Sequence, residues 1–282
     1  MKKYHLELAG LSALLETPEE ILIGERLRPF LCSPHEKPDC TIRVQPSATL
    51  PAFAEGGVWH GTECYDMLGN TRRVFHCSAL GAAAFAVTQL EETGDVTLLV
   101  LPAYMSRFAG TSGIFNRIGM ETLLLQHYGL LLHASLILYQ GKAIAFTGPS
   151  GIGKSTQAAL WQRCFGAEIL NGDRAALRQQ ETGWEAYGCP YAGTSGIYKN
   201  AHGPLTALVA LGQGKENKLR RLNQAEAFRV VYPELTVHYW DKSFTAAAAD
   251  LCLRLLQQVP VYLLECLPEE SAAQLLKEGL ML

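Results

Sequence analysis

The stretch from residue 147 to residue 156 constrains the fold of this chain more than any other. It reads Thr-Gly-Pro-Ser-Gly-Ile-Gly-Lys-Ser-Thr and fits the pattern G-x-x-x-x-G-K-[ST] of a phosphate-binding P-loop. Glycines let the backbone of such a loop bend and approach a ligand closely, and its N–H groups then cradle phosphate oxygens. The pattern predicts that Lys154 contacts the β- and γ-phosphates of a nucleotide and that the Ser155 hydroxyl contacts Mg²⁺.

The residues on either side of this loop support the same interpretation. Residues 142–147 form a short apolar run that is typical of a buried strand, and residues 155–163 are typical of a helix. A strand, a glycine-rich loop and a helix in this order are what the motif requires. The expected nucleotide-binding residues are Gly148, Pro149, Ser150, Gly151, Ile152, Gly153, Lys154, Ser155 and Thr156.

The composition is that of a globular protein. Of the 282 residues, 48% are hydrophobic and 18% are charged, and the formal net charge is −3. The chain can therefore bury a sizeable core, and nucleic acid is not expected as its main partner. The first residues turn polar at once, unlike a signal peptide. The most apolar region, 123–138, is interrupted by polar residues and broken by Gly129, so no membrane span is expected. We therefore expect a cytoplasmic protein.

Eight cysteines are scattered along the chain, and no two of them form a C-x-x-C pair. Reduced thiols packed as small apolar groups are the expected state. Cys32, His35 and Cys40 are the one cluster that suggests a metal site, but no second pair of ligands lies at a matching distance. A proline-rich loop that happens to contain these residues is therefore favoured over a zinc site.

Two domains are expected from the order of strands and helices. Residues 1–105 contain short apolar stretches separated by turn signals, which predict a β-rich domain of meandering type. Residues 106–116 are expected to be a linker, and residues 117–282 interleave strands with helices. Because some of these strands follow one another as hairpin-like pairs, the expected fold is α/β with a mixed sheet flanked by helices.

Two further residues near the P-loop stand out. His133 is expected on the strand at 130–138, which neighbours the P-loop strand. Asp173 is expected at or just past the end of a strand at 168–170, where a carboxylate can handle Mg²⁺ or an attacking nucleophile. Other interpretations are a turn-forming role for Asp173 and a buried, hydrogen-bonded histidine at 133. Residues 188–203 are expected to form a loop near this site.

These motifs together resemble the catalytic domain of HPr kinase/phosphorylase, which is itself similar to phosphoenolpyruvate carboxykinase around the nucleotide. The resemblance covers residues 117–282 and does not explain the N-terminal region. It is carried by His-Ala-Ser at 133–135, Gly-Pro-Ser-Gly-Ile-Gly-Lys-Ser at 148–155 and Gly-Asp-Arg at 172–174. Tyr-Gly-Cys-Pro-Tyr at 187–191 and Val-Pro-Val-Tyr-Leu-Leu-Glu at 259–265 are similar to divergent HPr-kinase-like proteins, which often act on ribosomally made, modified peptides.

The resemblance implies an HPr kinase/phosphoenolpyruvate carboxykinase-like fold, ATP and Mg²⁺ as cofactors, and transfer to a serine of a peptide or small protein. It implies that Lys154 contacts the phosphates, that Ser155 and Asp173 hold Mg²⁺, and that Asp173 takes the proton of the serine hydroxyl. His133 matches an active-site histidine of the family. The sequence departs from the family at Gly172, where the family has the first Asp of a pair, and this departure weakens the expectation of a reverse, phosphorylase reaction. The family's later Mg²⁺-binding Glu and its loop arginine have no clear counterpart in the sequence.

Three functions stay open at this point. The first is an ATP-dependent kinase that acts on serine in a peptide or small protein. The second is a small-molecule kinase or carboxykinase-like enzyme, and the third is a non-catalytic nucleotide sensor whose output is the β-rich region. That region is open to three roles as well, which are recognition of a leader peptide, formation of a homo-oligomer and support of the fold.

Overall fold

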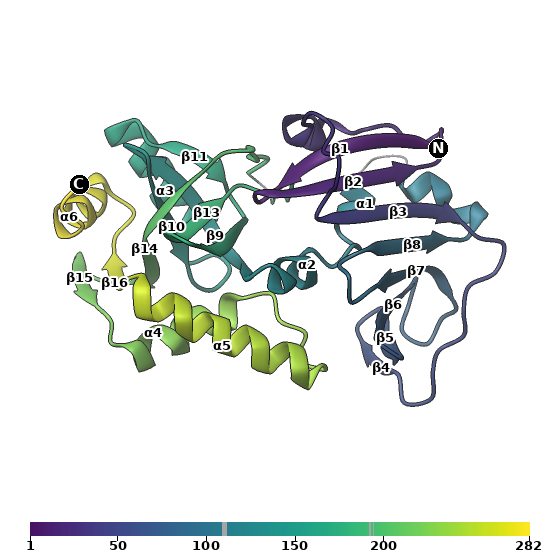
Figure 1. Cartoon of the computed structure of the whole chain (residues 1–282). Helices are drawn as coiled ribbons and strands as arrows, with labels where there is room; N and C mark the ends of the chain where they lie inside the picture. Colours follow the sequence, from purple (N-terminus) through teal and green to yellow (C-terminus); the bar gives the residue numbers. More distant parts are fainter. Residues whose placement is uncertain (109–111, 192, 194) are drawn as a thin grey trace. The chain divides into compact units, whose positions relative to one another are not determined.

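The computed structural model describes residues 1–108, 112–191, 193 and 195–282. The chain divides into two compact units, Met1–Leu123 and Leu124–Leu282, and helix α2 (Met120–Gln126) contains the boundary (Figure 1). Residues 109–111 of the expected linker lie outside the described residues. On either side of them are two short helical segments, η2 (Pro102–Phe108) and α1 (Ser112–Phe115).

The first unit is built on an eight-stranded mixed sheet with the spatial order β1-β2-β3-β8-β7-β6-β5-β4. β4 to β8 form the expected antiparallel meander, whereas β3 pairs parallel with both β2 and β8. A simple meander therefore describes only part of this unit. The strands are β1 (Lys2–Leu8), β2 (Leu11–Thr17), β3 (Cys40–Pro46), β4 (Val58–His60), β5 (Glu63–Leu68), β6 (Thr71–Cys77), β7 (Ala84–Leu90) and β8 (Val96–Val100), with a 3-10 helix η1 at Glu25–Phe30.

A buried ion pair joins β5 to β6 in this unit. Arg73 lies opposite Asp66 in the strand register, and its guanidinium donates to both carboxylate oxygens at 2.7 and 2.6 Å. The side chains are only 4% and 3% exposed. Asp66 also accepts a hydrogen bond from the backbone N–H of Ala54 at 2.6 Å, so the pair fixes a neighbouring loop as well as the two strands.

Replacing Arg73 with methionine is expected to destabilise the first unit by about 3–5 kcal/mol, because Asp66 would stay buried without its counter-ion. The matched control is Lys3→Met, which breaks the pair of Lys3 with Glu16, where the lysine side chain is 62% exposed. That change should cost no more than about 1 kcal/mol. Urea unfolding, monitored by hydrogen exchange of β5 and β6, measures the loss of stability in both variants. Equal losses of stability in Arg73→Met and Lys3→Met would contradict a stabilising role for the buried pair.

The second unit is an α/β unit whose strands lie in a mixed sheet system. The spatial order is β10-β9-β12-β13-β14-β16-β15, and β11 pairs with β9. β14 pairs parallel with β10 and with β16, and the other pairings are antiparallel. The strands are β9 (Gly129–Tyr139), β10 (Lys142–Thr147), β11 (Glu168–Asn171), β12 (Arg174–Gln180), β13 (Gly183–Tyr187), β14 (His202–Gln213), β15 (Lys218–Arg221) and β16 (Val261–Cys266).

Helices cover both faces of this sheet system, as the sequence predicts. Successive side chains of a strand point to opposite faces. Along β10, Ala143 and Ala145 belong to one core. Ile144 and Phe146 belong to the other, which also contains Trp161 of α3. The first core includes residues of α4 (Gln224–Val231) and α5 (Lys242–Gln258), and the second includes residues of α3 (Lys154–Phe165) and α6 (Glu270–Gly279) (Figure 1).

Helix α2 begins at Met120, directly after Gly119, whose φ of +67° is outside the helical range. The strand expected at 168–170 extends to Asn171 as β11, and residues 174–180 form a further strand, β12. Among the described residues, no helix is both long enough and apolar enough to cross a lipid bilayer.

Candidate active site

The predicted P-loop connects the end of β10 to the start of α3. Thr147 is the last residue of β10, and Lys154 is the first residue of α3. Gly148 has a φ of +133° and Gly153 a φ of +111°, in the left-handed region that only glycine adopts readily. Gly153 is the N-cap of α3 and has no side chain to accept hydrogen bonds from the first turn. The N–H groups of that turn are therefore suited to hold an anion.

Lys154 is anchored on the loop itself. Its ammonium donates to the carbonyl oxygens of Gly148 at 2.6 Å and of Pro149 at 3.1 Å, and the residue is only 7% exposed. Burial lowers the pKa of Lys154, and the carboxylates of Glu234 and Asp173 oppose this shift. The positive charge of Lys154 thus lies at the loop, where it interacts electrostatically with the carboxylates of Glu234 and Asp173.

Residues 148–156 fit a nucleotide with Mg²⁺ in this geometry. Ser155 and Thr156 lie in the first turn of α3 and are exposed, so the Ser155 hydroxyl is open to a metal ion. A Mg²⁺ beside phosphates needs few protein ligands, because water and phosphate oxygens complete its shell. The described residues contain no group of three or more His, Cys, Asp or Glu side chains that could by itself hold a metal ion.

Asp173 is held beside β9 by an asparagine turn. β11 and β12 both pair with β9, one after the other, since Asn171 pairs with Leu136 and Arg174 pairs with His133. The fully buried Asn171 accepts hydrogen bonds from the backbone N–H groups of Asp173 and Arg174, both at 2.8 Å. Such a side chain bends the backbone locally. The Asp173 carbonyl still accepts from Ala134 N at 3.0 Å, so the turn stays fixed to β9.

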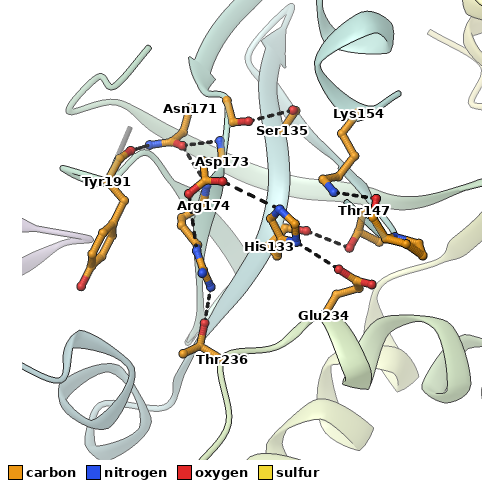
Figure 2. Close-up of polar contacts among 12 residues, drawn as sticks. His133, Ser135, Thr147, Lys154, Asn171, Asp173, Arg174, Tyr191, Glu234 and Thr236 are labelled. Carbon is orange, nitrogen blue, oxygen red and sulfur yellow. Dashed lines mark hydrogen bonds and ion pairs between the residues drawn. The ribbon is translucent and has the colours of Figure 1, made fainter. Parts of the chain in front are cut away.

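The His133 ring lies between two carboxylates (Figure 2). Nδ1 is 3.2 Å from Oε2 of Glu234, which is hydrogen-bonding distance, and Nε2 is 3.8 Å from Oδ1 of Asp173. The Asp173 side chain is 34% exposed and that of Glu234 is 14% exposed, so Asp173 is the carboxylate that a substrate can reach more easily. The Arg174 Nε lies 3.6 Å from the other oxygen of Asp173.

Two hydroxyl contacts tie this cluster to its neighbours. The Thr147 hydroxyl donates to the carbonyl of His133 at 3.1 Å, which joins the end of the P-loop strand to β9. The Arg174 guanidinium donates to the hydroxyl of Thr236. The structure thus brings His133, Asp173 and Lys154 to one site, and their chemical roles stay predictions.

Glu234 is the member of this site that the sequence does not reveal. It lies in a 3-10 helix, η3 (Tyr232–Glu234), and 101 positions separate it from His133. It is followed by Leu235, which forms an isolated antiparallel bridge with Leu132 of β9. A glutamate after a Tyr-Pro pair is an ordinary surface pattern, so only the tertiary pairing of this segment with β9 reveals its position.

The structure gives a steric reason for glycine at 172. A Cβ atom placed on Gly172 would overlap the Ser195 hydroxyl oxygen and lie 2.7 Å from the Ser195 Cβ. A Cβ on Gly193 would lie 2.9 Å from the Cβ and Cγ of Asp173. The second carboxylate that the resemblance would place at 172 therefore has no room. Positions 192 and 194 of the loop expected at 188–203 lie outside the described residues.

Gly172→Ala is expected to destabilise the protein by about 1–3 kcal/mol, as overpacking does, because its methyl group must displace Ser195. Ser195→Gly removes the obstructing side chain. Gly172→Ala should therefore cost much less stability in the Ser195→Gly protein than in the unaltered protein. Thermal unfolding of all four proteins tests this coupling, and strictly additive losses would contradict it.

Comparison with known proteins adds a distant similarity of structure. No protein-family model matches the sequence, and no match was found among curated proteins. One similar solved structure is the HPr(Ser) kinase/phosphatase from Coxiella burnetii, at 15% sequence identity and a TM-score of 0.31. The alignment covers 54% of this chain and 87% of that chain. A similarity at this level does not assign a family.

Proposed function

We propose that this protein is an ATP-dependent kinase that transfers the γ-phosphoryl group to a serine hydroxyl of a peptide or small protein. The observation that carries the proposal is the glycine-rich turn between β10 and α3 with Lys154 bound to it, close to an accessible carboxylate at Asp173. This arrangement provides a phosphate cradle and a proton acceptor in one site.

The chain contributes positioning and charge neutralisation, which are the main contributions that phosphoryl transfer requires. Mg²⁺-ATP, when bound, supplies the phosphoryl group and part of the positive charge. The loop N–H groups and Lys154 would hold the phosphates and balance the negative charge that develops on them, and Ser155 and Asp173 would hold Mg²⁺. Asp173 orients the serine hydroxyl and accepts its proton while the oxygen forms its bond to phosphorus and the bond to the leaving ADP oxygen breaks.

A sensor that binds nucleotide without transferring phosphate is the alternative that one observation favours. Ser195 fills the space in which a second carboxylate would lie at position 172, so the site has fewer metal-facing groups than the resemblance implies. A kinase or carboxykinase-like enzyme for small molecules would use the same loop and Asp173, since a P-loop recognises phosphates and not the acceptor.

Release of ADP with different acceptors distinguishes these functions. The protein is incubated with Mg²⁺-ATP and a serine-containing peptide library, with the same library carrying alanine for serine, or with a mixture of hydroxylated and carboxylated metabolites. The proposal predicts that only the serine peptides accelerate ADP release. Acceleration by metabolites alone would instead establish a small-molecule enzyme, and ATP binding without ADP release in any mixture would establish a sensor.

A further inference from the structure

We propose that Glu234 is a positioning residue that sets the orientation and the protonation pattern of the His133 ring. In this arrangement the N–H of His133 Nδ1 donates a hydrogen bond to Glu234, and Nε2 of the same ring faces Asp173. The consequence for catalysis rests on the proposed kinase function, whereas the ring arrangement can be measured in the free protein.

The first argument is the chemistry of the contact. An ionised carboxylate only accepts hydrogen bonds, and Oε2 of Glu234 lies 3.2 Å from Nδ1 of His133. The hydrogen bond therefore requires a proton on Nδ1. In a neutral ring Nε2 is then an acceptor, and it faces Oδ1 of Asp173 at 3.8 Å, longer than a hydrogen bond.

The second argument is that the fold fixes Glu234 in place. The segment after η3 is bound to β9, because Thr236 N donates to Leu131 O at 2.9 Å and Leu235 bridges to Leu132. Thr236 also accepts from Arg174, the residue opposite His133 on β12. Glu234 is thus held beside the ring by a backbone bridge on its own segment, independently of its side-chain contact with His133.

The third argument is the place of this ring in the proposed site. Nε2 of His133 faces Oδ1 of Asp173 at 3.8 Å, so the contact of Nδ1 with Glu234 sets how the ring lies beside the carboxylate that orients the acceptor hydroxyl. Arg174, which contacts Asp173, and Lys154, whose charge interacts with both carboxylates, are also charged groups of this site. Loss of Glu234 would therefore act on transfer through the ring and Asp173.

Long-range ¹H–¹⁵N spectra of the free protein test the ring arrangement directly. The His133 signals are assigned from their loss in His133→Gln. We expect Nδ1 to be protonated in the unaltered protein, and we expect Glu234→Ala to move the proton to Nε2. Glu234→Gln, which keeps the shape and an accepting oxygen, is the second variant if Glu234→Ala does not fold, and it should keep the proton on Nδ1. An Nδ1 without a proton in the unaltered protein, or unchanged ring signals in Glu234→Ala, would overturn the proposal.

A second histidine–glutamate pair in the same unit provides the matched control. His202 Nδ1 lies 2.8 Å from Oε2 of Glu185, and its side chain is 51% exposed. Glu185→Ala should alter the His202 signals and leave phosphoryl transfer unchanged. Glu234→Ala should lower kcat by about 10–100-fold, the size of effect seen when a metal-bound histidine loses its outer-shell partner, with the KM for ATP little changed. Transfer at the unaltered rate in Glu234→Ala would overturn the proposal and leave the kinase function standing. Absence of transfer in the unaltered protein would remove the kinase function, and the ring spectra would still decide the role of Glu234.

Discussion

Lys154→Met is expected to lower phosphoryl transfer by at least about 100–1000-fold, the effect of removing one preorganised group that stabilises developing negative charge. It should also weaken the binding of ATP, because the ammonium would contact the phosphates in both the bound and the reacting state. Methionine keeps the buried aliphatic part of the side chain. It removes the ammonium, which in Lys154 donates to the carbonyls of Gly148 and Pro149. Calorimetry measures the binding, and ADP release with the serine peptides measures the transfer.

Lys199 provides the control for this substitution. Its ammonium pairs with Glu168 at 2.7 Å, and its side chain is 45% exposed, so Lys199→Met removes the same charge from the same unit at a surface pair. Transfer and ATP binding should both stay within about twofold of the unaltered protein, since exposed pairs contribute little. Lys154→Met with unaltered transfer would mean that the loop does not hold the reacting phosphates.

Asp173→Asn is expected to lower transfer by about 100–10,000-fold, the range of general base catalysis, and to leave the binding of ATP largely intact. The fold should tolerate the change because the contacts that place this residue use its backbone. Its N–H donates to Asn171, and its carbonyl accepts from Ala134. An asparagine keeps the shape of the side chain but cannot take up the proton of the acceptor hydroxyl.

Two measurements separate this role from a general loss of structure. Asp250→Asn changes an exposed aspartate on α5 that pairs with Arg254 at 3.5 Å, and it should leave transfer unchanged. Hydrogen exchange of β9 and β12 should be the same in Asp173→Asn and in the unaltered protein. If Asp173→Asn transfers phosphate at the full rate, another group takes the proton and the assignment of Asp173 fails.

The local elements around the P-loop could be predicted closely from the sequence. The strand at 142–147 coincides with β10, because a short apolar run is bounded by turn residues at both ends. Helix α4 likewise begins at a signal in the local sequence, where Asn223 and Glu226 form a reciprocal capping box. Both are local signals, in which residues only a few positions apart determine the structure.

Elements that depend on distant partners could not be predicted in this way. β12 begins with Arg174 and ends with two glutamines, a pattern without a strong strand signal, and its partners β9 and β13 make it a strand. The parallel pairing of β10 with β14 likewise joins segments that are far apart in the sequence. Tertiary context outweighs local propensity at such places.

The same difference holds within the candidate site. Lys154 and Ser155 could be chosen because the P-loop motif specifies both residue types and their spacing. Asp173 could be chosen from its place just past a strand beside the P-loop, whereas an active-site role for His133 needed the family resemblance, and Glu234 could not be chosen at all. Its contact with His133 exists because a segment of the chain 101 positions away is bound to β9.

The most direct test of the kinase function is intact-mass spectrometry of candidate acceptors after incubation with the protein, Mg²⁺ and ATP. The first acceptors to try are peptides encoded beside its gene, with Lys154→Met as the control protein. The account predicts that an acceptor gains the mass of one phosphate on serine and that this gain disappears with Lys154→Met and with Asp173→Asn. Binding of ATP without a gain of phosphate on any peptide or small protein would contradict the account.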